Sequence, residues 1–129
     1  MEKVKPEAIE SVEEFQQHIR ETEFYKEGCP VAAALNLLSG KWELKIIFLL
    51  LKYDKRRFVE LKKQLPGITN TVLTHCLKKF EMAGILYRQQ FNEMPLHVEY
   101  SLTDTGKSLI QVFYEFAKWG RCLGVELSS

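Results

Sequence analysis

The chain has 129 residues, of which 46% are apolar, and its formal net charge at pH 7 is +1. A chain of this length can bury one core of ordinary size but not two, so we expect one compact domain. No apolar run is long enough to cross a bilayer, and the Glu-rich start lacks the basic-then-apolar order of a secretion signal, which together predict a soluble, cytoplasmic protein that does not bind membranes.

Charge is distributed unevenly along the chain. Residues 1–30 contain four basic and eight acidic side chains, a balance of −4, whereas residues 41–88 contain eleven basic and four acidic side chains, a balance of +7. Contact with phosphates requires such a local excess of positive charge, although a single run of lysines is more often a solvated helix face. The three cysteines have neither zinc-site spacing nor the even count of a disulfide scaffold, so we expect reduced thiols and no metal or other cofactor.

The N-terminal segment predicts an amphipathic helix. Ser11 and Glu14 have the spacing of a capping box, and apolar side chains recur at helical intervals until Gly28, which can end a helix, so we expect the first helix over residues 12–27. A short apolar stripe with an acidic flank suits packing against the domain or a partner subunit better than contact with DNA. The residues of this stripe assigned to a dimer interface are Phe15 and Ile19.

Two further helices are predicted before the basic segment. Pro30 suits the first turn of a helix, which favours a helix over 31–38 that ends at Ser39-Gly40. Residues 42–52 are apolar on nearly all sides, so this helix is predicted to be the buried centre of the domain. Trp42 and Phe58 are both assigned to the core.

Residues 58–83 have the pattern of a helix-turn-helix pair. The apolar spacing of 58–65 predicts a short amphipathic helix that ends at Pro66-Gly67. Thr69 can cap the next helix, over 70–83, whose apolar residues fall on one face and whose polar residues fall on the other. A hairpin beside such a pair would form the wing of a winged helix-turn-helix protein.

The wing and a terminal helix are predicted from the remaining sequence. Gly84 ends the preceding helix, and the β-prone runs 85–91 and 97–102 are joined by a short loop, as in a hairpin. Thr103 can cap a last helix with more aromatic residues than a small domain can cover by itself, so a second subunit is expected to cover them. The aromatic residues assigned to that interface are Phe113, Phe116 and Trp119.

The chain resembles a known family in the segments Cys29-Pro30-Val31, Gly40-Lys41-Trp42, Arg57-Phe58-Val59-Glu60-Leu61, Pro66-Gly67-Ile68-Thr69 and Val98-Glu99-Tyr100-Ser101-Leu102-Thr103. These segments resemble the HxlR-type transcriptional regulators, a branch of the MarR-like winged-helix proteins, over roughly residues 29 to 120. Because the segments occur in matching order, the resemblance is more specific than any single motif.

The resemblance implies a mainly α fold with a small β-hairpin, a winged helix-turn-helix of α+β type, in which N- and C-terminal helices form a dimer interface. It divides the chain into an acidic N-terminal helix (1–28), the winged-helix domain (29–120) and a C-terminal tail (121–129). It also implies a homodimer that binds double-stranded DNA at an inverted repeat, with half-sites about one helical turn, roughly 34 Å, or a multiple of it apart.

Two positions depart from what such proteins often carry. Thr71 stands where an Arg is common near the start of the DNA-reading helix, and the uncharged loop 94–97 stands where a wing lysine is common. Fewer charged contacts imply weaker or more salt-sensitive binding, or a different operator.

Polar and basic side chains around the helix pair are the candidates for DNA contact. Those proposed to read bases in the major groove are Asn70, Thr71, Thr74, His75 and Lys78. Those proposed to contact phosphates are Arg88, Arg56, Arg57, Lys62 and Lys63, and Lys79 is a further candidate for DNA contact. The alternative is an ordinary solvated surface, which would be preferred for any of them in isolation but not between a tight turn and a hairpin.

Cys29 is the candidate for redox sensing. At the N-cap of a helix that begins with Pro30, unpaired N–H groups and the helix dipole favour a thiolate, and in some relatives a cysteine at the matching position senses oxidants or electrophiles. The alternative is a small, half-buried residue at the start of a helix. Cys76 is expected in the core, and nothing in the sequence supports a disulfide between Cys29 and Cys122.

The pattern does not predict an enzyme. The three histidines, His18, His75 and His97, fall on different predicted elements, and no nucleophile elbow or phosphate-binding glycine loop is present. We therefore expect a dimeric transcriptional regulator, such as a repressor, that responds to a small-molecule or electrophile effector. The alternatives are a winged-helix module that binds a protein instead of DNA, and a regulator that binds a small molecule between its terminal helices and its DNA-binding lobe, without thiol chemistry.

Overall fold

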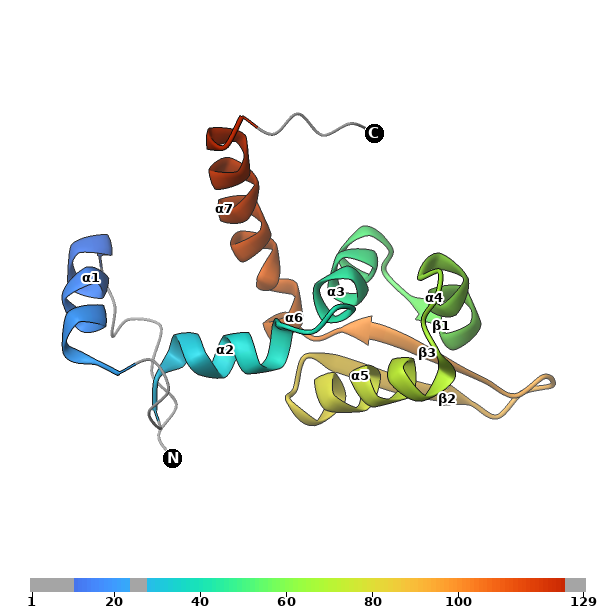
Figure 1. The fold of residues 1–129 in the computed structure, drawn as a ribbon. Coiled ribbons are helices and arrows are strands. Elements are labelled where there is room, and N and C mark those ends of the chain that lie inside the picture. The colour runs from blue at the N-terminus through green and yellow to red at the C-terminus, as the bar shows by residue number, and fades with distance from the viewer. Residues whose placement is uncertain (1–10, 24–27, 125–129) are drawn as a thin grey trace. The chain divides into compact units, whose positions relative to one another are not determined.

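The computed structural model describes residues 11–23 and 28–124, and the chain forms two compact units, residues 1–40 and 41–129. Figure 1 shows the elements of each unit. The predicted division at residues 28/29 and 120/121 stays a prediction.

The first unit contains two helices. In α1 (Val12–Glu21), the Ser11 hydroxyl accepts a hydrogen bond from the N–H of Glu14 at 3.0 Å, as the capping-box spacing predicted. The predicted end of this helix is wrong, because Thr22 is already extended, with φ −117° and ψ 136°. Threonine is β-branched and favours extended backbone, and the rest of the expected helix, residues 24–27, lies outside the described residues. Gly28 adopts φ +88° just before the second helix, α2 (Pro30–Leu38), instead of capping the first.

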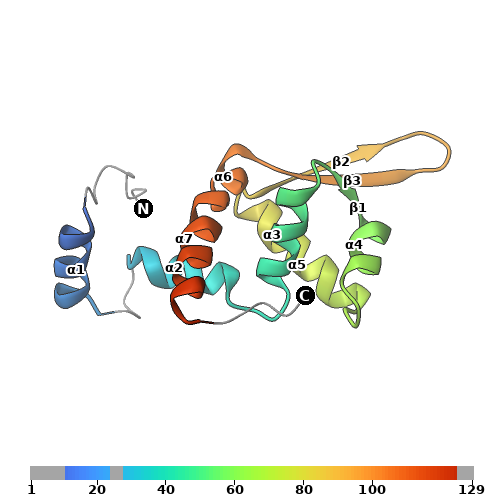
Figure 2. The same cartoon turned by 90° about the horizontal axis from the view of Figure 1, so that it is seen from above.

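The second unit contains the remaining described elements. They are α3 (Glu43–Lys52), β1 (Arg56–Arg57), α4 (Phe58–Gln64), α5 (Asn70–Met82), β2 (Leu86–Phe91), β3 (His97–Leu102), α6 (Asp104–Lys107) and α7 (Leu109–Cys122). Its core lies where α3, α4 and α5 meet, and Figure 2 shows these helices beside the β2–β3 hairpin. The largest fully buried side chains are Ile46 and Ile47 of α3, Leu61 of α4, and Leu73, Leu77 and Phe80 of α5.

The sheet has three antiparallel strands in the order β1-β3-β2. The predicted hairpin is confirmed, with a register that runs from Leu86 opposite Leu102 to Phe91 opposite His97. Strand β1 was not predicted, because two residues are too few to have a recognisable alternation of polar and apolar side chains. It pairs Arg56 with Tyr100 at the base of the wing.

The expectation that α3 is buried on nearly all sides is wrong. Ile46, Ile47 and Leu50 are buried, but Phe48 is 55% exposed. Hydrophobicity alone indicates only which side chains favour burial, and Phe113 of α7 covers the ring of Phe48 only in part. Trp42, which was assigned to the core, is half-buried, and the ammonium groups of Lys41 and Lys45 lie 4.9 and 5.1 Å from its ring centroid. Phe58 is likewise half-buried.

The predicted last helix is two helices. Thr103 caps only the four-residue α6, where its hydroxyl accepts from the N–H of Gly106 at 3.1 Å, and α7 begins after Ser108. Gly106 is buried so closely that a Cβ atom there would lie 2.4 Å from the carbonyl oxygen of Ile85. No residue of α7 is buried, and its aromatic residues Tyr114, Phe116 and Trp119 are exposed, as the sequence suggested, whereas Phe113 is half-buried.

Candidate nucleic-acid interface

The candidate interface is built on α5. The Pro66-Gly67 turn, with Gly67 at φ +94°, precedes this helix, and the Thr69 hydroxyl caps it by accepting from the N–H of Val72 at 3.1 Å. Glycine adopts a positive φ more readily than other residues, so Gly67 allows the tight turn at this position. The side chains that fix the helix to the core are Leu73, Cys76, Leu77 and Phe80.

Anchoring one face of α5 in the core leaves the opposite face in solvent. The five residues proposed to read bases are all exposed, and they are Asn70, Thr71, Thr74, His75 and Lys78. Four of them, Thr71, Thr74, His75 and Lys78, recur at intervals of three or four residues and therefore share one face of the helix. Their exposure agrees with the prediction, while their contact with DNA stays a prediction.

The wing adds to this face. A concave surface of about 280 Å³ is lined by Thr74, Lys78 and Glu81 of α5 together with Arg88 of β2 and Tyr100 of β3. The fold thus brings Lys78 and Arg88, ten positions apart in the sequence, to one site. Glu81 was not among the predicted site residues, although its position three residues after Lys78 was sufficient to place it near that face.

Two of the basic residues predicted to contact DNA have partners within the protein. Lys79 is half-buried and forms an ion pair with the buried Glu43 of α3. The guanidinium of Arg56 lies 3.5 Å from the ring centroid of Tyr53 and pairs with Glu60 at 2.7 Å. Both cations therefore link elements of the fold.

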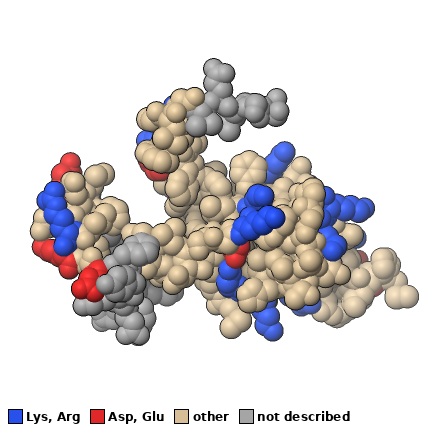
Figure 3. Space-filling view, viewed as in Figure 1, with Lys and Arg blue, Asp and Glu red and all other residues tan. Residues whose placement is uncertain are grey.

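The other candidate cations differ in exposure. Arg57, Lys63 and Arg88 are exposed, whereas Lys62 is half-buried and its ammonium lies 3.4 Å from the carbonyl oxygen of Ile68. On the face seen in Figure 3, the blue basic side chains of the second unit gather over α3, α4 and α5.

The acidic partners have shifted pKa values. Burial raises the pKa of Glu43, but the hydrogen bond and charge of Lys79 and the backbone N–H groups of Glu43 and Trp42 outweigh burial, so the pKa lies below its ordinary value. The pKa of Glu60 is also lowered, chiefly because its carboxylate accepts from the N–H of Arg57 at 2.8 Å and lies beside Arg56. Both carboxylates are thus favoured in their ionised forms.

The three cysteines lie in different surroundings. Cys29 is the N-cap of α2, as predicted, but it is only 7% exposed and its side chain forms no capping hydrogen bond. It lines an apolar cavity of about 330 Å³ in the first unit, together with Phe15, His18, Ile19, Thr22 and Val31. Cys76 is in the core, where burial raises the pKa of its thiol, and Cys122 is exposed.

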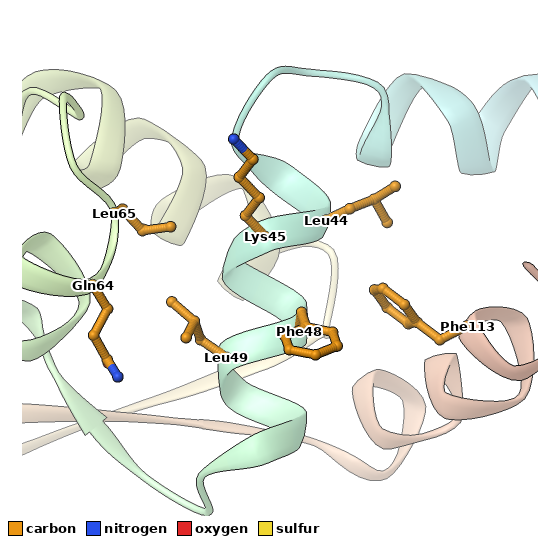
Figure 4. Close-up of a pocket in the computed structure, with 7 residues that line it drawn as sticks. All are labelled: Leu44, Lys45, Phe48, Leu49, Gln64, Leu65 and Phe113. Atoms are coloured by element: carbon orange, nitrogen blue, oxygen red, sulfur yellow. The ribbon is translucent and has the colours of Figure 1, made fainter. Parts of the chain in front are cut away.

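A shallow apolar groove crosses α3 in the second unit. Figure 4 shows its lining, in which the ring of Phe48 faces that of Phe113 of α7 with 6.1 Å between centroids. The groove measures about 350 Å³, and the Oε1 atom of Gln64 at its edge is buried without a hydrogen-bond partner. Its residues come from three separate sequence segments, so no sequence motif could have identified it.

Within residues 11–23 and 28–124, no cluster of His, Cys, Asp and Glu is arranged to hold a metal ion. In the same part of the chain, no helix is both long enough and apolar enough to span a membrane.

A helix pair with a tight turn, followed by a hairpin, is the arrangement that the sequence predicted for a winged helix-turn-helix protein. The chain matches the HxlR-like helix-turn-helix family over residues 37–126. The protein belongs to this family.

Similar proteins agree with the assignment. YybR of Bacillus subtilis strain 168, an uncharacterised HTH-type transcriptional regulator, is 39% identical to this HxlR-like protein over 95 residues, 74% of this chain and 75% of YybR. A solved structure from Porphyromonas gingivalis W83, assigned to the MarR family of transcriptional regulators, is 36% identical with a TM-score of 0.68 and covers 78% of this chain and 97% of its own.

The redox regulator HypR in its oxidised form is 34% identical with a TM-score of 0.65 and covers 73% of this chain and 96% of its own. These comparisons confirm the predicted family and its MarR-like winged-helix fold. The HxlR-like protein is thus a member of a family of transcriptional regulators.

Proposed function

We propose that this HxlR-like protein regulates transcription as a homodimer that binds a specific operator in double-stranded DNA. The observation that carries the proposal is the concave surface on which Lys78 of α5 and Arg88 of the wing lie together beside exposed Thr74. The major groove of B-DNA is wide enough for one α-helix, and the residues at the start of α5 are polar and exposed.

The side chains divide into two roles. The hydroxyl groups of Thr71 and Thr74 and the imidazole of His75 suit hydrogen bonds to base edges, whereas Lys78 and Arg88 suit phosphates or guanine. Glu81 repels phosphates and can instead accept a hydrogen bond from the amino group of cytosine. Base recognition would therefore depend mainly on uncharged side chains.

Regulation would follow from occupancy of the operator. A bound dimer blocks or assists polymerase, and an effector acts by favouring one of two separations between the DNA-reading helices. Such an effector is either a compound that reacts with a thiol or a small molecule in the groove of Figure 4.

Salt dependence of binding to random duplex DNA tests the DNA-binding proposal. The logarithm of the wild-type affinity should fall with the logarithm of salt concentration, with a slope of about −0.9 for each phosphate contact. Replacing Lys78 and Arg88 together by alanine should weaken binding at least about tenfold and make the slope shallower, because up to two phosphate contacts are lost.

The matched control removes two exposed lysines of α6 and α7, through Lys107→Ala and Lys118→Ala. This variant has the same change of net charge, and its affinity should stay near that of the wild type. Equal losses in the two variants would contradict the placement of DNA on α5 and the wing. Almost no binding by the wild type at low salt would instead favour a module that binds a protein.

The proposal extends to Cys29 as a thiol that responds to oxidants or electrophiles. Cys29 is the N-cap residue of α2, and the similar protein HypR is a redox regulator. The apolar cavity beside Cys29 suits an uncharged electrophile. Cys76, whose pKa is raised by burial, is unsuited to this role.

Labelling of the native protein with iodoacetamide at neutral pH, followed by mass spectrometry, tests the thiol proposal. Cys29 should react faster than glutathione and much faster than Cys76, while the exposed Cys122 provides an internal reference. A rate for Cys29 no higher than that of glutathione would remove the sensor role and leave Cys29 as a structural residue.

A further inference from the structure

The tip of the wing is apolar and lacks positive charge. Met94 is 99% exposed and Leu96 is 63% exposed, and residues 89–99 contain Glu93 and Glu99 but no lysine or arginine. Figures 1 and 2 show from two directions that the end of the β2–β3 hairpin projects beyond the helices of its unit, and no blue side chain lies at that end in Figure 3. The tip therefore has no lysine or arginine with which to neutralise a phosphate.

Local contacts hold the tip in shape. Phe91 and His97, the last register pair, stack with 4.8 Å between ring centroids and 15° between ring planes. The Nδ1 atom of His97 lies 3.4 Å from the carbonyl oxygen of Pro95, and the amide nitrogen of Gln90 donates to the side-chain oxygen of Asn92 at 3.1 Å. Met94 and Leu96 are thus presented to solvent by a loop that is organised before any partner binds.

The same ribbon continues from the candidate DNA surface. Arg88 lines that surface, and the exposed amides of Gln89, Gln90 and Asn92 lie between it and the tip. Proteins that bind the minor groove use Asn and Gln amides at base edges, and they insert side chains such as Met, Leu and Pro between base pairs. In the β2–β3 hairpin, amide side chains follow Arg88, and apolar side chains lie beyond them at the tip.

We propose that Met94 and Leu96 form an apolar wedge that enters the minor groove beside the α5 site, partly unstacks one base step and bends the operator. This inference rests on the proposed DNA binding and names what the wing recognises. Because the wedge makes no phosphate contact, it favours DNA that is easily deformed, such as the flexible TA and CA/TG steps. Glu93 opposes close approach of the phosphates, so Glu93→Gln should tighten binding.

The experiment uses the full chain and a duplex of about 40 base pairs, three to four helical turns, selected from a random pool by the wild-type protein. Bending is measured by energy transfer between dyes at the duplex ends, and unstacking by 2-aminopurine fluorescence at the steps facing the wing. The test variant is Met94→Ser with Leu96→Ser. The matched control exchanges the two residues, through Met94→Leu with Leu96→Met, and keeps the tip apolar.

The wild type and the exchange variant should bend the duplex and raise 2-aminopurine fluorescence. The serine variant should lose both signals and bind about tenfold more weakly, while the salt slope stays unchanged because no phosphate contact is removed. Its circular dichroism should match that of the wild type, because both replaced side chains are exposed.

A serine variant that bends and binds the selected duplex like the wild type would overturn the wedge, as would a wild-type complex with straight DNA. If the serine variant binds normally but fails to control transcription by purified polymerase, the tip contacts a protein and the wedge is also overturned. Failure of the proposed function differs from these outcomes, because the wild type would then bind no duplex at low salt.

Discussion

At the level of single residues, the ion pair between Glu43 and Lys79 is a contact that the sequence did not predict. The sequence predicted that Lys78 is exposed, because a helical period relates it to the apolar residues of α5. Lys79 was assigned to DNA contact, but it pairs with Glu43, which lies 36 residues earlier in the chain. The helical period of α5 shows that Lys79 does not lie at the centre of the exposed face. The partner of Lys79 could not be predicted, because it depends on how α3 packs against α5.

The pair predicts a pH-dependent contribution to stability. The pKa of Glu43 is lower in the folded protein than its ordinary value of 4.5, so the contribution is fully present above that value and is lost as the pH falls through the folded pKa. Glu43→Gln should therefore lower the free energy of unfolding by about 1–2 kcal/mol at pH 7, because a half-buried ammonium loses its charged partner.

Urea denaturation at pH 7 and at pH 3 measures this difference. The gap between the wild type and Glu43→Gln should shrink at the lower pH, while the exposed Glu81→Gln should leave the free energy of unfolding almost unchanged at both. An equal gap at the two pH values would show that the ionised carboxylate is not the source of the stabilisation.

At the scale of elements, helices and strands with several apolar positions could be predicted, and short ones could not. Residues 70–83 and 97–102 have enough apolar positions to show their period, residues 85–91 are β-prone, and the structure has α5, β3 and β2 there. Strand β1 and helix α6 have two and four residues, too few for a pattern. Ser108 ends α6 and precedes α7, and the tight packing of Gly106 within α6 is not visible in the spacing of residues along the chain.

A single methyl group added at Gly106 is expected to lower the free energy of unfolding. In Gly106→Ala the new Cβ would lie 2.4 Å from the carbonyl oxygen of Ile85 and 2.9 Å from a side-chain carbon of Leu102, so the backbone must shift. We expect a loss of about 1–3 kcal/mol in the free energy of unfolding, as for other overpacked sites.

Thermal or urea unfolding measures this loss in the free energy of unfolding, and the neighbouring Thr105→Ala is the control. Thr105 is exposed, and alanine favours helix, so this variant should be neutral or slightly more stable. A Gly106→Ala protein as stable as the control would mean that α6 can move away from Ile85 without cost.

At the scale of the whole molecule, α7 is the element that a single chain leaves incomplete. Its exposed apolar side chains include Ile110, Val112, Tyr114, Phe116 and Trp119, and Leu123, which follows the helix, is also exposed. Exposed apolar patches of this kind mark protein interfaces, and a homodimer places the same patch on both partners. The sequence predicted the excess of aromatic residues, but the geometry of an interface depends on a second chain.

The proposed dimer predicts that one charge in this patch separates the subunits. Phe116→Glu should shift the molar mass in solution from dimer to monomer at micromolar concentration, because a carboxylate buried without a partner is strongly unfavourable. Sedimentation or light scattering measures the mass.

Phe116→Leu, which keeps the side chain apolar, should stay dimeric. A wild type that is monomeric at these concentrations would contradict the proposed homodimer, and a Phe116→Glu dimer would place the interface elsewhere on the protein.

Contacts at the first residue and at the middle of α3 link this helix to two others. Phe48, near its middle, contacts Phe113 of α7, while Glu43, its first residue, pairs with Lys79 of α5. A rotation of α3 at Phe48 would also move the carboxylate of Glu43, which pairs with Lys79 of α5. In the proposed DNA-binding homodimer, a rearrangement of the subunits would thus reach the proposed base-reading residues without the melting of any helix.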